Sequence, residues 1–494
     1  MAKNCKISNL KANLCIRLFL LVSFQVIFRP LQAQDATQLS SAYRHFLNFE
    51  LDSCTTALEQ NKITPLGFYL KSLLASATVF VNDDADQYAA KKSLESDLLD
   101  ELSEQSFSTA YSNFLRSEIK LQWAILKFKN GDEFSAFWSL KQAYAIAESN
   151  VKKYPQFIPS YKTLGLLHVL YGSFPDKYDW ILSLFGLEDD VEKGLGELEL
   201  AAKGDRYLSI EINVMRGLIY TYLLNDPAMG SSIIRSVYEQ GSYLLVDYAY
   251  ALVLMKNSES DIALDIIEKV DATYPQPFKI SQIYYAYGEI LLQKGLHYDA
   301  IDKYRQFLSI KTRGNLVKDA YYKIGIGYLM ENNTDSASYN FEASVLNGLA
   351  KNEADKNARI AVESGIIPNK NLLQLRYATD GGFYEAAFDI YSQMKPELLN
   401  TQDKCEYLYR SARLFHKTGE VEKALQYYQK TIDHQQEENW YFAPNASLQS
   451  ALIFIDQNKL EMAKKYLNQV NNYKGYPYQN SIRQKARAAS RQIN

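Results

Sequence analysis

Histidine and cysteine are the side chains that most often hold transition metals, and both are sparse in this chain of 494 residues. No two histidines have the His-x-x-x-His spacing that places both rings on one helix face, and no Cys-x-x-Cys pair occurs. We therefore predict no metal site built from neighbouring residues and no bound cofactor. The histidines are His45, His168, His297, His416 and His434.

Motifs for nucleophilic or phosphate chemistry are also missing. The chain has no Gly-x-Ser-x-Gly elbow and no Gly-x-x-x-x-Gly-Lys loop. Its acid pairs, such as Asp189-Asp190 and Glu437-Glu438, have the polar neighbours typical of solvated turns. We therefore predict no catalytic residues and a protein that is not an enzyme. A catalytic site assembled from distant parts of the chain is the alternative that a single sequence leaves open.

The first 33 residues have the pattern of an export signal. Several cations precede an apolar run from Leu18 to Phe28, and Pro30 and a small-residue stop at Ala33 follow it. At about 1.5 Å per residue this run is too short to cross a hydrocarbon core of about 30 Å. We predict a signal peptide over 1–33, no membrane-spanning segment after its removal, and location in the periplasm or cell envelope, including the periphery of the outer membrane. The cations are Lys3, Lys6, Lys11 and Arg17.

Charge and cysteine usage limit the partners and the cross-links. The formal net charge is −3, and the leader carries only cations, so the mature chain is more acidic. This balance argues against nucleic acid as the partner. Cys54 and Cys405 lie near opposite ends of the mature chain, and we expect two buried free thiols rather than a disulfide.

The elements that must position any site are helices arranged in a repeat. Between Ser281 and Leu346 one pattern of small and aromatic residues occurs twice, 37 positions apart. It resembles the tetratricopeptide repeat (TPR), in which small residues mark the place where the two helices of a pair touch. The resemblance implies an all-α fold, a right-handed superhelical solenoid of about ten antiparallel helix pairs. The matched residues are Tyr284, Gly288, Ala300 and Tyr304, then Tyr321, Gly325, Ala337 and Phe341.

Four segments are expected along the chain. After the leader, residues 34–243 form divergent TPR-like pairs, residues 244–366 regular repeats with an extra helix, and residues 367–494 the last repeats and a capping helix. In the first segment we expect one charged helix over Asp84–Glu104. A pair over Phe107–Lys129 and Glu133–Lys153 follows it, joined by a turn at Asn130-Gly131-Asp132. The basic tail around Lys485 is expected to be the solvated face of the cap, with each repeat contacting only its neighbours.

An insertion over 172–192 interrupts one pair. Its aromatic residues are too apolar to be left together in water, so we expect them to pack, a binding arm being the alternative. This segment and the later Asp380-Gly381-Gly382 are similar to stretches of the inclusion-body-clearance family of TPR-like proteins, which implies the same fold and an adaptor role. The aromatic residues are Phe174, Tyr178, Trp180 and Phe185.

Candidate binding residues follow from the TPR register. In that family the first helix of each repeat lines a concave groove, and its fifth position is tyrosine in four of six repeats here. Tyrosine suits contact with an extended peptide or a sugar chain, although rings at these positions could instead pack between helices. The charged set of chaperone-tail receptors is not reproduced. The candidate residues are Tyr248, Tyr285, Tyr322 and Tyr409, with Glu289 and Arg413 beside them.

The leading hypothesis is an exported, non-catalytic TPR scaffold or adaptor that binds a protein or peptide in its concave groove. The alternative is a cell-envelope glycan-binding protein similar to SusD-like receptors, which are also built on TPR-like helices. This chain lacks the cysteine directly after the leader that anchors those receptors to lipid. An enzyme is the third hypothesis.

Overall fold

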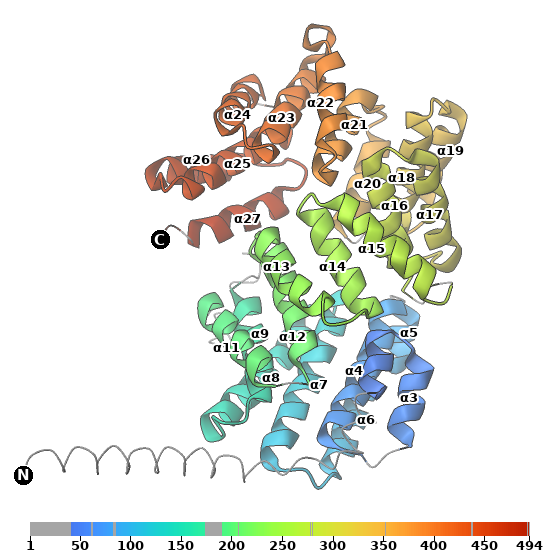
Figure 1. Cartoon of the computed structure of the whole chain (residues 1–494), viewed down its shortest axis with the longest axis vertical. Coiled ribbons are helices and arrows are strands. Elements are labelled where there is room, and N and C mark those ends of the chain that lie inside the picture. Colours follow the sequence, from blue (N-terminus) through green and yellow to red (C-terminus); the bar gives the residue numbers. More distant parts are fainter. Residues whose placement is uncertain are drawn as a thin grey trace, which may run out of the picture.

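The computed structural model describes residues 41–494 except 61–62, 83–84, 173–189, 206, 277, 279, 351, 436–437, 492 and 494. All regular elements within this part of the chain are helices (Figure 1). The predicted leader and nearly all of the insertion over 172–192 lie outside the described residues.

The N-terminal half begins with short helices and continues with long pairs. The long helix α7 and its partner α8 are joined at the predicted turn, where the Asp132 side chain accepts a hydrogen bond from the Ser135 amide (3.3 Å) and caps α8. The helices are α3 (Leu51–Glu59), α4 (Pro65–Asn82), α5 (Ala85–Lys91), α6 (Leu94–Ser103), α7 (Thr109–Lys129), α8 (Glu133–Lys153), α9 (Pro159–Tyr171), α11 (Val191–Gly204), α12 (Ser209–Leu218) and α13 (Pro227–Tyr238).

The prediction of a single helix over Asp84–Glu104 is wrong. The chain breaks between Lys91 and Leu94, giving α5 and α6. The break lets α5 lie against α4 while α6 turns toward α7, where Leu98 and Leu102 are buried. Burial of these apolar side chains outweighs the continuity of one charged helix.

The C-terminal half contains the regular repeats. The helices are α14 (Leu244–Lys256), α15 (Ser260–Thr273), α16 (Gln282–Lys294), α17 (His297–Ile310), α18 (Val317–Met330), α19 (Thr334–Leu346), α20 (Glu353–Glu363), α21 (Lys370–Gly381), α22 (Tyr384–Gln393), α23 (Thr401–Lys417), α24 (Val421–Gln435), α25 (Phe442–Asp456), α26 (Leu460–Asn472) and α27 (Gln479–Arg491).

Small residues fix the spacing within these pairs. A Cβ atom on Gly288 would lie 2.9 Å from the ring of Tyr304, and one on Gly325 would lie 2.5 Å from the ring of Phe341. The rings therefore occupy the space that a larger side chain on the facing helix would need, and Ala300 is buried at the same crossing. The predicted all-α, TPR-like fold of antiparallel helix pairs is confirmed.

The array does not remain a simple stack of neighbours. Helix α20 packs on α18 and α19, and α21 then packs against α16 and α14. The expectation that each repeat contacts only its neighbours is therefore wrong in this half. In Figure 1 the orange helix α21 lies next to α16 and α14, although α17 to α20 separate it from α16 in the sequence.

Two adjacent glycines make this closure possible. Gly382 has φ +86°, and a Cβ atom there would overlap the carbonyl oxygen of Ser258 in the turn after α14. A Cβ atom on Gly381 would lie 2.9 Å from the Cβ of Gln293 on α16. The turn between α21 and α22 can dock on α14 and α16 only because side chains are absent at both positions.

Candidate functional site

The inner faces of α16 and α18 carry a polar network that includes two of the predicted site residues. The hydroxyl of Tyr285 donates to the Asp319 carboxylate, and its ring lies 5.6 Å, centroid to centroid, from those of Tyr304 and Phe307. Burial raises the pKa of Asp319 to about 6, opposed by the nearby Lys323 ammonium. The Tyr285 side chain thus joins two helices through both its ring and its hydroxyl.

Glu289 is held by its own partners in the same network. It accepts a hydrogen bond from the Tyr304 hydroxyl and pairs with Lys323 at 3.0 Å. The Lys323 ammonium in turn lies 5.2 Å from the centre of the Tyr377 ring on α21. Since Tyr377 is buried, α21 covers this stretch of the inner face.

The remaining predicted tyrosines lie in different settings. Tyr248 and Tyr322 are half-buried, and Tyr322 packs on Phe341 at 5.6 Å between ring centres. Tyr409 is buried among aromatic rings, and its oxygen accepts a hydrogen bond from Asn445 (2.7 Å). Four of the six predicted residues therefore form two pairs, Tyr285 with Glu289 and Tyr409 with Arg413, and α21 packs against the helices of both pairs.

Arg413 belongs to a second feature, a cluster of cations around one carboxylate. Asp380, at the end of α21, lies 3.6 Å from the Arg376 guanidinium and 3.9 Å from that of Arg413. Burial opposes ionisation of Asp380, but the surrounding arginines and Lys256 outweigh it and lower its pKa. The cations of this basic cluster are Lys256 on α14, Arg376 on α21, Arg413 and Lys417 on α23, and Lys485 on α27.

The basic cluster is enclosed by protein yet reachable by solvent. The exposed fractions of the Asp380, Arg376 and Arg413 side chains are 39%, 35% and 19%. Loss of hydration is nevertheless the largest influence on the pKa values of Lys417 and Lys485, lowering both to about 8. These side chains are thus partly exposed and partly desolvated, and the surface that they form together is called the recess below.

The sequence contained no local indication of this recess. Its five cations come from four helices, and in the sequence Asp380 stands out only within a family-like Asp-Gly-Gly stretch. The tail around Lys485 is expected to be a solvated outer face, and Lys485 itself is half-buried, with Lys256 and Arg413 adding to the effect of desolvation on its pKa. The packing of α21 against α14, α16 and α23 brings these residues together.

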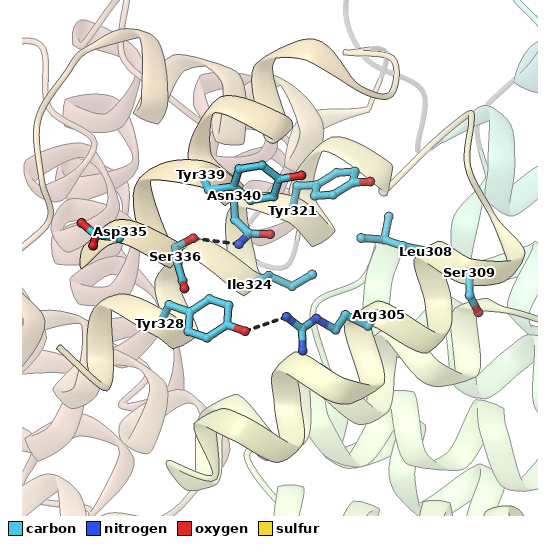
Figure 2. A pocket seen from close by; sticks show the side chains of 10 residues that line it. All are labelled: Arg305, Leu308, Ser309, Tyr321, Ile324, Tyr328, Asp335, Ser336, Tyr339 and Asn340. Atoms are coloured by element: carbon cyan, nitrogen blue, oxygen red, sulfur yellow. Dashed lines mark hydrogen bonds between the residues drawn. The ribbon is translucent and has the colours of Figure 1, made fainter. Parts of the chain in front are cut away.

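A separate cleft lies on the outer side of the repeats, between α17, α18 and α19 (Figure 2). Its volume is about 580 Å³, and tyrosines 321, 328 and 339 line it together with polar side chains. Arg305 donates to the Tyr328 hydroxyl (2.6 Å), and Tyr339 is 71% exposed. Figure 2 shows the three phenol rings around the opening, with Asn340 and Ser336 between them.

The described residues offer neither a metal centre nor a membrane span. Among the described residues, no three histidine, cysteine or acidic side chains are grouped so that they could hold a metal ion. None of the helices in the described ranges is both long and apolar enough to span a bilayer. Cys54 and Cys405 are buried free thiols, as predicted, and burial raises their pKa values to about 11 and about 12.

Comparison with known proteins gives structural likeness only. No protein-family model matches the chain, and no curated protein matches it in sequence. Among solved structures, the TPR protein YrrB, described as having an unusual peptide-binding site, is 12% identical, with a TM-score of 0.31. The match covers 44% of this chain and 96% of YrrB.

Two matches that cover more of this chain have similar sequence identities and TM-scores. A human IFIT1 dimer with PPP-AAAA is 14% identical over 80% of this chain and 89% of its own, with a TM-score of 0.37. Aspartyl phosphate phosphatase F from Bacillus subtilis is 13% identical over 73% and 94%, with a TM-score of 0.36. At these values the likeness carries no argument about what this chain binds.

Proposed function

We propose that this protein is an exported, non-catalytic scaffold of TPR-like helix pairs that binds a protein partner through a segment entering the recess between α21, α23 and α27. The observation that supports this most is that Arg413, Arg376 and Asp380 remain accessible to solvent although protein surrounds them. Convergent polar groups at a partly enclosed place are typical of sites where proteins bind ligands.

The proposed binding face differs from an open groove along α14, α16 and α18. Helix α21 packs on α14 and α16, and the hydroxyl of Tyr285 is already bonded to Asp319. A partner would have to displace α21 to reach that tyrosine. The recess beyond α21, which includes Arg413, needs no such displacement.

Capture from cell-envelope extracts tests this function. The wild type is compared with Arg413→Glu, which reverses one charge in the recess, and with Lys404→Glu as a matched control. Lys404 lies on the same helix, is exposed and belongs to the outer surface. Loss of the same captured protein in Arg413→Glu alone supports the proposal, and equal capture by all three proteins contradicts it.

Export is part of the proposal and rests on the leader pattern at residues 1–33. The expected mature N-terminus is Gln34. N-terminal sequencing of the protein recovered by osmotic release checks this. Full-length protein retained in washed membranes would contradict it.

The outer cleft supports a second candidate function, glycan binding. Three tyrosine rings beside amide, hydroxyl, carboxylate and guanidinium groups offer both stacking surfaces and hydrogen bonds to a sugar chain. Calorimetric titration with envelope oligosaccharides tests this, using Tyr339→Ala as the variant. Tyr298→Ala, which removes an exposed tyrosine of α17 that does not line the cleft, is the control.

A further inference from the structure

The basic cluster has more positive charge than its own acids neutralise. Asp380 contacts two arginines, but no ion pair joins Lys256, Lys417 or Lys485 to an acid among the described residues. The other carboxylates that raise the pKa values of Lys417 and Lys485 are Glu259, at the start of α15, and Glu353, at the start of α20.

Like charges in the recess act on one another. At Lys417 the pKa is lowered first by desolvation, then by Arg413 and Lys256, and it is raised by Asp380 and Glu259. At Lys485 desolvation, Lys256 and Arg413 lower the pKa, while Glu353 and Asp380 raise it. Repulsion among partly desolvated cations opposes folding, and a bound anion would relieve it.

We propose that the basic cluster binds an acidic peptide segment, rich in aspartate and glutamate, from the protein partner. This rests on the proposed function and names the chemistry of its ligand. Carboxylates match both kinds of cation present, since guanidinium groups bind them in a bidentate manner and ammonium groups attract them as point charges.

A peptide fits this place better than a nucleic acid does. The cations of the recess come from the ends of α14 and α23, from α21 and from α27, and a short extended peptide offers its carboxylates one after another to such a set. The molecule as a whole is acidic, with a formal net charge of −3, and this balance disfavours a partner with a phosphate backbone.

Fluorescence anisotropy with a labelled ten-residue peptide of alternating Asp and Glu tests the proposal. The uncharged Asn and Gln peptide of the same length is the reference. The wild type should bind only the acidic peptide, and Lys417→Gln/Lys485→Gln should weaken binding on the order of tenfold or more. Lys404→Gln, on the outer surface of α23, should leave binding unchanged.

The pH dependence of binding distinguishes the recess from ordinary surface lysines. Because the pKa values of Lys417 and Lys485 are about 8, wild-type affinity should fall between pH 7 and pH 9. Surface lysines, with pKa values of about 10.4, would keep their charge over this range. If the double variant does not fold, Lys256→Gln, at the exposed end of α14, replaces it.

Three results would overturn the proposal: equal binding of both peptides, equal weakening in Lys404→Gln, or tighter binding of a single-stranded RNA of equal length. Failure of the inference can be separated from failure of the function. If envelope capture still depends on Arg413 but acidic peptides do not bind, the scaffold function stands and the ligand chemistry is wrong.

Discussion

Lys417 and Lys485 show how strongly position in the fold changes the chemistry of a single residue. Both are ordinary lysines in the sequence, yet desolvation and neighbouring cations lower their pKa values to about 8. In the unfolded chain their pKa values return to about 10.4. Their charge therefore destabilises the folded state at neutral pH.

The sign of the pH effect follows from this difference. Between about pH 8 and pH 10.4 the unfolded chain binds more protons at these lysines than the folded one does, so their contribution to stability rises with pH. Lys417→Gln/Lys485→Gln should melt at a higher temperature than the wild type at pH 7. The difference in melting temperature between the double variant and the wild type should shrink toward pH 10. Calorimetry at several pH values measures it, and a difference independent of pH would contradict it.

A buried ion pair in the N-terminal half gives a second residue-scale prediction. Lys162 on α9 lies 2.6 Å from Glu118 and 3.0 Å from Glu211. The side chains of Lys162 and Glu118 are almost completely buried. Lys162→Met should lower the free energy of unfolding by about 3–5 kcal/mol, because it leaves the Glu118 charge buried without its counter-ion.

The matched control for that change removes both charges. Lys162→Met/Glu118→Gln keeps an acceptor for the Thr163 hydroxyl while removing the unpaired carboxylate. It should be less destabilised than Lys162→Met alone in urea titrations. A double variant that is as unstable as the sum of the two single variants would show that the charges act independently.

At the scale of elements, local patterns predicted most helices. The Asn130-Gly131-Asp132 turn placed the start of α8 correctly, because a glycine with φ +85° and an aspartate cap act within a few residues. The break between α5 and α6 was missed because it depends on what α6 packs against. The recess was missed for the same reason, since its residues come from helices that only the packing of α21 brings together.

At the turn between α21 and α22, one substitution should distinguish the stability that comes from docking on α14 from the stability that comes from the backbone conformation of glycine. Gly382→Ala should destabilise the protein by about 1–3 kcal/mol or more, since the new Cβ meets the Ser258 backbone. Gly419 has nearly the same φ, +83°, but open space around it. Gly419→Ala should therefore cost only the strain of the positive φ, about 1 kcal/mol.

Chemical denaturation of both alanine variants measures this difference. Equal losses in the two would mean that the conformational preference of glycine, rather than the close approach to Ser258, explains Gly382. A larger loss for Gly382→Ala would support docking of α21 on α14 as a stabilising contact.

The whole molecule is closed by contacts between helices far apart in sequence. Besides α21 on α14 and α16, the N-terminal segment reaches α14, where the Leu244 amide donates to the Asn48 side chain (3.3 Å) and Phe49 joins the same core. An open solenoid is a chain of nearest-neighbour contacts and can lose end repeats one at a time. Contacts between helices far apart in sequence should instead make distant repeats unfold together.

Hydrogen exchange tests that coupling. In the wild type, amides of α14, α16 and α21 should become exposed in one cooperative opening, because each of these helices is covered by another. In Gly382→Ala the amides of α21 should exchange faster than those of α14, since the docking contact is weakened while the α14–α15 pair remains intact. Gly419→Ala should keep the wild-type pattern. Independent exchange of α14 and α21 in the wild type would show that the closure holds the helices in place without making them one folding unit.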